Sequence, residues 1–489
     1  MTRRLTVVVL LAAAAVAGAA QLNINGVNRA EAWACFDSVY STQVEDKLDL
    51  NLRYGDLKGQ VGFFLFEPSK PWDDVRKPMR LLDYSVAYSP DQLEVLYGRF
   101  YQDFGKGLVL RAYKDDDFRH YKSLFGLRGT ARLPLGTEVV ALSARLRDLF
   151  FQENVYKLMN LSDSSDQAMG ANLSSRPLRW LGFGGRYVRI NRDLDPAPKA
   201  FTELFGGDLT TSFGPVELYG EVARRFGTGP GLGGRSTGFG YYANATLAYS
   251  GLSVLGQVMD YDSIGFPTGL YHWNDPPTPI KSGVAMNRGV DERGFGFVAT
   301  ATPLSALYVE ADYGRLVTND DTSAGVVEWE GKARYDLETS WTYEAYFNHL
   351  VQNNVELGTY RRAVDKPVVH VSYLAGQHTF AFEGEYAFVD ERSTHGDSWD
   401  YHEAAVALSY GYGAGLLFTL GYQRVDVVLD KRYNGETSWP MVEAVWSVTE
   451  RNMLRVRLGA ERGGYTCSGG VCRFEAPFKG IKVQLISRI

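Results

Sequence analysis

Apolar and polar residues alternate along most of the chain with a period of two. Between Gln377 and Phe388, one face collects aromatic residues and the other collects short or charged residues. The first face consists of Phe380, Phe382, Tyr386 and Phe388, and the second of Thr379, Ala381, Glu383, Glu385 and Ala387. Strands have this period because successive side chains point to opposite sides of a sheet. The pattern therefore predicts an all-β protein.

Two architectures give every strand one apolar and one polar face. A soluble sandwich packs its apolar faces together, whereas a membrane barrel turns them to lipid and keeps the polar faces in its lumen. Segments of ten or more residues favour the barrel, because a tilted strand needs about 9–11 residues to cross a bilayer. The polar faces also carry charges that suit a lumen, or alternatively the solvated face of a sandwich: Arg53, Glu94, Arg145, Arg147, Glu221, Glu310, Asp312, Glu383, Glu385, Arg455 and Arg457.

The connections between these segments alternate between short and long. Turns such as Gly55–Leu57 and Gly413–Ala414 are separated by long connections such as Asp260–Asp291. Up-and-down outer-membrane barrels combine short periplasmic turns with long external loops. With an opening strand at Leu22–Trp33 and a closing strand at Pro477–Ile489, the sequence predicts one antiparallel transmembrane barrel of about 24 strands, with roughly 22 as the alternative. Both termini are then expected on the periplasmic side.

The composition narrows the choice of partners. No internal run of about 18 apolar residues occurs, which excludes a membrane-spanning helix. Glycine (52 residues) and aromatic residues (13%) are abundant, as expected for turns and strands. The net charge of −6 argues against a nucleic-acid partner. The expected partners are outer-membrane lipid outside the barrel and a polar solute inside it.

Both ends of the chain carry signals of export. Arg3 and Arg4 precede the apolar run Leu5–Val16 and a small-residue cleavage pattern, so residues 1–20 are expected to be a signal peptide and residues 21–489 the barrel. An uncleaved anchor is the alternative. The last strand resembles the C-terminal recognition strand of outer-membrane proteins, although it ends in Ile489 instead of an aromatic residue. This resemblance implies the barrel-assembly machinery as a partner during biogenesis.

Only three cysteines occur, so the chain has no disulfide framework. Cys467 and Cys472 are separated by a short loop, and in an exported protein we expect them to form a local disulfide.

Signals of catalysis are weak. The seven histidines are scattered, and no H-E-x-x-H, G-x-S-x-G or P-loop motif occurs. Asp115–Asp117 and Asn319–Asp321 could bind a hard cation, but solvated loop residues are the simpler interpretation. Strand patterning begins by Lys47, so an N-terminal plug domain is not expected. We expect neither an enzyme nor a cofactor nor a metal site.

The stretch Tyr97–Phe118 departs from the simple alternation. It combines three glycines with aromatic residues and charges of both signs. In porin-like barrels a loop at this outer position folds inward, and residues 100–121 are the candidate here. A mixed-charge constriction would then consist of Arg99, Asp103, Lys106, Arg111, Asp115, Asp116 and Asp117, with tight bends at Gly98, Gly105 and Gly107. An external loop, or a longer strand with a glycine bulge, is the alternative.

The same stretch resembles a known family. Gly98-Arg99-Phe100-Tyr101, Phe104-Gly105-Lys106-Gly107-Leu108, Leu110-Arg111 and Tyr113 are similar to the G-x-F-Y…F-G-x-G-L-x-L-R-x-Y motif of a family of bacterial outer-membrane barrels known only as a domain of unknown function. Cys472-Arg473 and Pro477-Phe478-Lys479-Gly480 resemble the closing segment of that family. The resemblance implies an outer-membrane barrel and supplies no substrate or catalytic residue.

Two functions follow from this picture as expectations. The first is a porin-like channel, passive or substrate-selective, for polar solutes. The second is a structural or assembly barrel that anchors a surface or secretion complex through its external loops. The long connection Asp260–Asp291 motivates the second, because Tyr271, His272 and Trp273 would be exposed there. Uptake of a hydrophobic ligand is disfavoured, because the predicted lumen faces are charged.

Overall fold

A computed structural model describes most of residues 21–489. The segments that it does not describe are 1–20, 37–41, 69–78, 116–119, 149–162, 193–199, 230–233, 266–272, 282–290, 320–323, 339, 355–358, 427–435, 469–470 and 476–477. The predicted signal peptide therefore lies outside the described residues.

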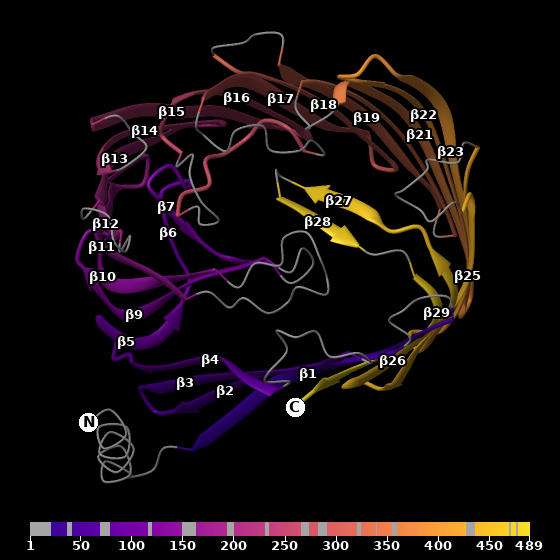
Figure 1. Ribbon diagram of the computed structural model, residues 1–489, viewed down its shortest axis with the longest axis horizontal. Helices are drawn as coiled ribbons and strands as arrows, with labels where there is room; N and C mark the ends of the chain where they lie inside the picture. Colours follow the sequence, from indigo (N-terminus) through magenta and orange to yellow (C-terminus); the bar gives the residue numbers. More distant parts are fainter. Residues whose placement is uncertain are drawn as a thin grey trace.

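The chain forms one closed antiparallel barrel of 24 strands, as the sequence predicts (Figure 1). The first strand, β1 (Leu22–Cys35), pairs with β2 and also with the last, β29 (Phe478–Arg488), and this pairing closes the ring. The other barrel strands are β2 (Thr42–Tyr54), β3 (Leu57–Pro68), β4 (Met79–Tyr88), β5 (Leu93–Phe100), β9 (His120–Leu133), β10 (Thr137–Asp148), β11 (Asp163–Leu178), β12 (Leu181–Arg192), β13 (Ala200–Phe213), β14 (Val216–Gly229), β15 (Gly234–Tyr249), β16 (Leu252–Asp262), β17 (Asp291–Leu304), β18 (Leu307–Val317), β19 (Gly325–Leu337), β20 (Trp341–Asn353), β21 (Thr359–Ala375), β22 (His378–Ser393), β23 (Ser398–Tyr412), β24 (Leu416–Val425), β25 (Ser438–Thr449) and β26 (Asn452–Glu461).

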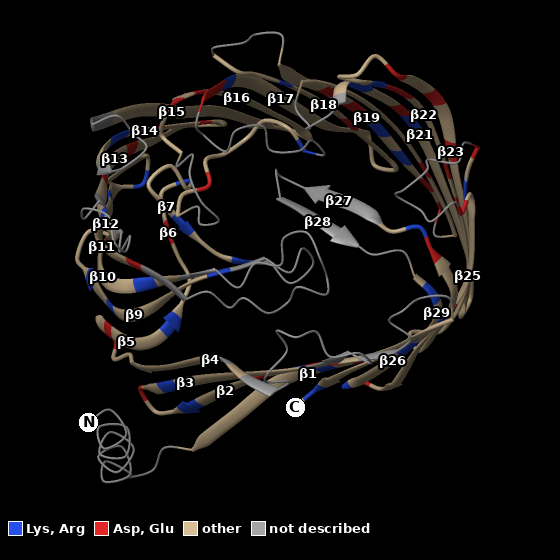
Figure 2. Cartoon of the chain, viewed as in Figure 1, with Lys and Arg blue, Asp and Glu red and all other residues tan. Residues whose placement is uncertain are grey.

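The outer surface of the barrel is apolar, in agreement with the alternation in the sequence. On β22, Phe380, Phe382 and Phe388 are exposed, whereas Ala387 and Val389 between and beyond them are buried. Figure 2 shows charges of both signs along the strands. The described residues include no helix that is long and apolar enough to cross a membrane.

Five short strands are not part of the ring of 24. They are β6 (Gln102–Phe104), β7 (Leu110–Ala112), β8 (Lys114–Asp115), β27 (Gly464–Ser468) and β28 (Val471–Glu475). The register of β27 and β28 sets Cys467 opposite Cys472. Their side chains are outside the described part of the structure, so the disulfide stays a prediction.

One stretch of wall reverses the expected faces. On β10, Val140, Leu142 and Leu146 are buried, whereas Arg145 is exposed on the other face. Arg145 was predicted to lie on the lumen face, and this prediction is wrong. The physical reason is that a second layer of chain covers the inner face of this wall and makes it a hydrophobic core.

Candidate functional site

Residues 101–113 form a β-hairpin inside the barrel, here called the inner hairpin (Figure 1). Its two strands, β6 and β7, pair Asp103 with Arg111 and Phe104 with Leu110. Because cross-strand partners share a face, one side of the hairpin is charged and the other apolar. Phe104 and Leu110 have no exposed surface, whereas Asp103 is exposed. The hairpin is thus amphipathic and turns its charges away from the wall.

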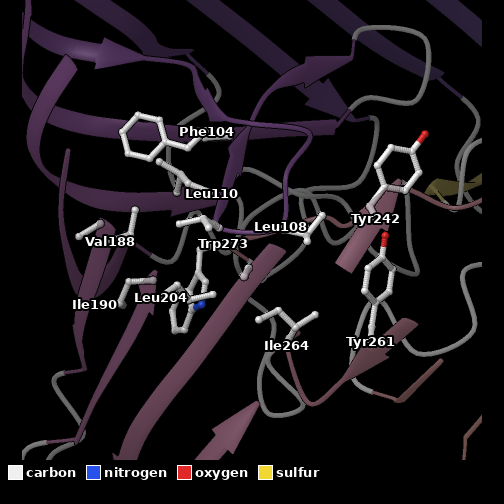
Figure 3. Close-up of a cluster of buried hydrophobic side chains, with 14 of the residues drawn as sticks. Phe104, Leu108, Leu110, Val188, Ile190, Leu204, Tyr242, Tyr261, Ile264 and Trp273 are labelled. Carbon is white, nitrogen blue, oxygen red and sulfur yellow. The ribbon is translucent and has the colours of Figure 1, made fainter. Parts of the chain in front are cut away.

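The apolar side of the inner hairpin packs on the inner face of the barrel wall. Phe104, Leu108, Val109 and Leu110 are all fully buried. They join one cluster with wall residues that include Val188 and Ile190 on β12 and Leu204 on β13 (Figure 3). Gly170 and Gly206 make room for this contact, since a Cβ at Gly206 would lie 2.6 Å from the Cγ2 atom of Val109. Hydrophobic packing therefore fixes the hairpin to β10–β16.

A buried charge cluster fixes the tip of the inner hairpin. The backbone N–H of Lys106 donates to Oε2 of Glu221 at 2.7 Å, and the Tyr219 hydroxyl donates to the same atom at 2.8 Å. Arg186 donates to Oε1 of Glu221 at 2.8 Å and also pairs with Asp208. The side chains of Arg186 and Glu221 are 2% and 0% exposed. The tip is therefore held by a hydrogen bond to a carboxylate that is itself buried in the wall.

Gly105 allows this close approach. Its φ is +69°, and a Cβ there would overlap the guanidinium of Arg186 and the carboxylate of Glu221. Only glycine meets both demands without strain.

A second segment runs along the inner face of the wall, beside the inner hairpin and then over β17 and β18. After β16 the structure describes residues 263–265 and 273–281, and residues 273–281 are here called the inner segment. The N–H of Arg111 donates to the carbonyl of Trp273 at 2.8 Å, and the N–H of Asp275 donates to the carbonyl of Gly107 at 3.0 Å. Buried Asn274 donates to the carbonyl of Leu108 at 3.0 Å. Backbone and side-chain bonds thus join the two inner elements into one layer.

Acidic side chains on β18 and β19 bind the far end of the inner segment. Lys281 Nζ lies 2.7 Å from Glu310 and 2.9 Å from Asp312, both on β18, and 3.9 Å from Glu330 on β19. Its backbone N–H donates to Glu328 at 2.8 Å. Partial burial acts to lower the pKa of Lys281, but the hydrogen bonds and charges of Glu310 and Asp312 outweigh it and raise the pKa above its usual value. The ammonium group therefore stays charged at neutral pH.

The structure brings three of the predicted constriction residues together. Asp103, Lys106 and Arg111 lie on the inner hairpin, with Lys106 exposed at the tip and 5.6 Å from the ring centre of Tyr219. Arg111 is half-buried, lies 3.4 Å from Asp275 and packs over the ring of Tyr113.

The other predicted residues lie elsewhere. Arg99 is in the wall on β5, where it is 5% exposed and 2.6 Å from Asp83. Asp115 has its backbone in β8 but no described side chain, and Asp116 and Asp117 lie in an undescribed segment. The three predicted bend glycines, Gly98, Gly105 and Gly107, all have positive φ.

Sequence reasoning missed the inner segment. The connection Asp260–Asp291 was expected to be an external loop with exposed aromatics, but Trp273 is 1% exposed inside the barrel. The expectation is therefore wrong for Trp273, while Tyr271 and His272 lie outside the described residues. One signal for it was available in the sequence. The connection carries a lysine, Lys281, and the acidic residues Glu310 and Asp312 lie on the polar face of a later strand, where they could bind it.

The junction of the two inner elements gives a first prediction. Replacing Gly107, whose φ is +102°, with Ala puts a Cβ 2.5 Å from the carbonyl oxygen of Asp275. We expect this variant to lose about 1–3 kcal/mol of unfolding free energy, because a strained backbone and a clash coincide. Urea unfolding in lipid vesicles measures the loss.

A matched control separates strain from contact. Gly396 has a φ of +92°, close to that of Gly107, and a Cβ there meets nothing within 4 Å. Gly396→Ala therefore reports the cost of positive φ without a contact. Equal losses for the two variants would contradict the role given to the Gly107–Asp275 contact.

Among the residues that the structure describes, no group of three or more His, Cys, Asp or Glu side chains is arranged to hold a metal ion. The acidic residues around Lys281 are instead neutralised in part by that lysine.

Comparisons with solved structures show similarity of fold. The siderophore receptor PirA from Pseudomonas aeruginosa is 9% identical with a TM-score of 0.47, over 96% of this chain and 81% of that one. The FrpB iron transporter from Neisseria meningitidis is 8% identical with a TM-score of 0.45, over 95% and 82%. A chain of the E. coli P pilus tip assembly intermediate PapC-PapD-PapK-PapG is 9% identical with a TM-score of 0.52, over 96% of this chain and 60% of that one.

The fold and its apolar outer surface are those of a large bacterial outer-membrane β-barrel. No curated protein matches the chain in sequence. Residues 42–266 and 427–489 match the profile of the family of unknown function DUF6029. Because this match covers more than half of the chain, the protein belongs to the DUF6029 family.

Proposed function

We propose that the protein is a porin-like channel that lets polar solutes diffuse across the outer membrane, with both termini on the periplasmic side. The observation that carries the proposal is the orientation of the inner hairpin. It buries Phe104 and Leu110 against the wall and presents Asp103, Lys106 and Arg111 on its other side. A lumen narrowed by charged groups of both signs favours small polar solutes over apolar ones.

The attachment of the inner hairpin supports a fixed constriction. A plug that leaves to open a pore would have to expose fully buried Phe104 and Val109 and break the hydrogen bond from the Lys106 backbone to Glu221. The hydrophobic term alone would cost several kcal/mol. Solutes are therefore proposed to pass beside the hairpin, with no energised step and no catalysis.

The assembly-anchor alternative loses one of its motives. It relied on the long external loops and on exposed aromatics in the connection Asp260–Asp291, and Trp273 of that connection is buried in the inner layer, whereas Tyr271 and His272 lie outside the described residues. We therefore develop the channel alone.

Single-channel recording in planar bilayers tests the proposal. Purified folded protein should conduct, and two variants should shift its selectivity in opposite directions. Lys106→Gln removes a positive charge from the lumen and should favour cations, whereas Asp103→Asn removes a negative charge and should favour anions. Reversal potentials in a salt gradient measure both shifts.

Arg145→Gln is the matched control. It removes a charge from an exposed position on the opposite face of the wall, so it should leave the reversal potential unchanged. Absence of conductance from verified folded protein would refute the channel. Conductance with no shift in either inner-hairpin variant would remove Asp103 and Lys106 from the pore lining.

A further inference from the structure

The barrel wall has a weak seam between β4 and β5. These strands pair over four positions only, from Tyr88 opposite Val95 to Ser85 opposite Gly98. On its other side, β4 pairs with β3 up to Met79, and β5 pairs with β9 up to Phe100. The described residues thus give β4 no strand partner on the β5 side beyond Ser85.

Gly98 is the point at which the two strands part. Its φ is +123°, and a Cβ there would overlap the carbonyl oxygen of Tyr84. Two residues later the chain leaves the wall and enters the inner hairpin. The seam is therefore a direct consequence of sending residues 101–113 into the lumen.

Side chains, instead of backbone ladder bonds, span the seam. The buried ion pair of Arg99 and Asp83, 2.6 Å apart, connects β5 to β4 just beyond the last paired residues. On the outer face, the ring of Phe125 on β9 contacts those of Tyr84 and Tyr97, with centroids 5.2 and 6.0 Å apart. The inner face of the seam is therefore polar, and its outer face is aromatic.

This construction is unusual for a wall in lipid. Unpaired backbone groups are costly in hydrocarbon, which is why membrane barrels keep their strands paired all round. An ion pair and three rings can separate without breaking a row of backbone hydrogen bonds between strands. The charges of the pair suit the polar head of an amphiphile, and the rings suit its apolar chain. The apolar chain of such a molecule would contact the rings of Tyr84 and Tyr97, and its polar head would contact the charges of Asp83 and Arg99.

We propose that the β4–β5 seam is a lateral portal through which a single-chain amphiphile passes between the bilayer and the lumen. The Arg99–Asp83 ion pair holds the portal closed, and Tyr84, Tyr97 and Phe125 line it on the lipid side. The portal adds a second route to the proposed channel and does not depend on ion conduction. Its entrance lies in the wall, and the narrowed pore runs along the barrel.

Three single-cysteine variants test the portal, each made with the native cysteines replaced by serine. Ser85→Cys reports on the inner face at the last paired position, which borders the seam, Ala87→Cys on the inner face within the paired ladder, and Val86→Cys on the lipid side. Ser85 and Ala87 are a matched pair, because they are 8% and 5% exposed on the same face. Each protein is placed in phosphatidylcholine vesicles and treated with N-hexadecylmaleimide.

We expect the hexadecyl probe to label Ser85→Cys several-fold faster than Ala87→Cys, with Val86→Cys fastest. Asp83→Asn, which removes the ion pair with Arg99, should increase labelling at Ser85→Cys further and leave labelling at Ala87→Cys unchanged. A water-soluble maleimide should label Ser85→Cys and Ala87→Cys alike. Gel migration before and after heating verifies folding, and hydrogen exchange of residues 79–84 in the unsubstituted protein supplies a second measurement.

Two outcomes overturn the portal. One is equal labelling of Ser85→Cys and Ala87→Cys by the hexadecyl probe, both with Asp83 and with Asp83→Asn. The other is exchange of the backbone amides of residues 79–84 that is as slow as that of residues 85–88. Loss of conductance in bilayers leaves both measurements untouched, so the channel and the portal fail separately.

Discussion

Replacing Phe104–Ala112 with a short Gly-Ser linker is expected to enlarge the single-channel conductance and to destabilise the barrel. The conductance rises because the deletion removes the layer that narrows the lumen. Stability falls because Phe104, Leu108, Val109 and Leu110 are fully buried, and each contributes about 1.5–3 kcal/mol through burial. The total, on the order of 10 kcal/mol, is an upper bound because the unfolded chain also buries some apolar surface.

A point substitution separates the two effects. Val109→Ala removes buried methyl groups beside Gly206 but leaves the hairpin in place. It should cost about 1–2 kcal/mol in urea unfolding and leave the conductance unchanged. If the folded deletion variant conducts no more than the parent, the inner hairpin does not narrow the pore.

The barrel is predictable from sequence because lipid and water make opposite demands on alternate residues of every strand. Phe380, Phe382 and Phe388 follow that rule, and so does the amphipathic inner hairpin, in which Phe104 is buried and Asp103 exposed. Period-two alternation reports which side of a strand is covered. It does not say whether the cover is lipid or another part of the chain.

This ambiguity explains the error at β10. Val140 and Leu142 are apolar because the inner layer covers them, so their face was assigned to lipid and Arg145 to the lumen. The inner segment was missed for a related reason. Its position depends on contacts between residues far apart in sequence, such as Gly107 with Asp275 and Lys281 with Glu310.

Arg99 shows a third limit of sequence reasoning. A charge beside a glycine-rich stretch suggested a pore lining, but the bend at Gly98 opens the seam, and Arg99 fills it by pairing with Asp83. The motif was therefore correctly singled out, whereas the role of one of its charges depends on where two strands separate.

Arg186→Met is expected to be the most destabilising single substitution in the wall. Arg186 and Glu221 are buried, and Asp208 is paired with the same guanidinium. Methionine fills much of the volume but leaves two carboxylates without their cation, and removing one partner of a buried ion pair costs about 3–5 kcal/mol. Because Glu221 also accepts the N–H of Lys106, the loss should loosen the tip of the inner hairpin.

Two comparisons make this result interpretable. Arg189→Met breaks the pair with Glu203, in which the arginine is 40% exposed, and such pairs contribute only about 0–1 kcal/mol. The double variant Arg186→Met/Glu221→Gln should recover part of the loss, because a neutral amide oxygen still accepts from Lys106 and Tyr219 without a buried charge. Urea unfolding measures all three, and current noise in bilayers reports motion of the tip. If Arg186→Met costs no more than Arg189→Met, the charge cluster does not hold the inner hairpin, and hydrophobic packing alone fixes the constriction.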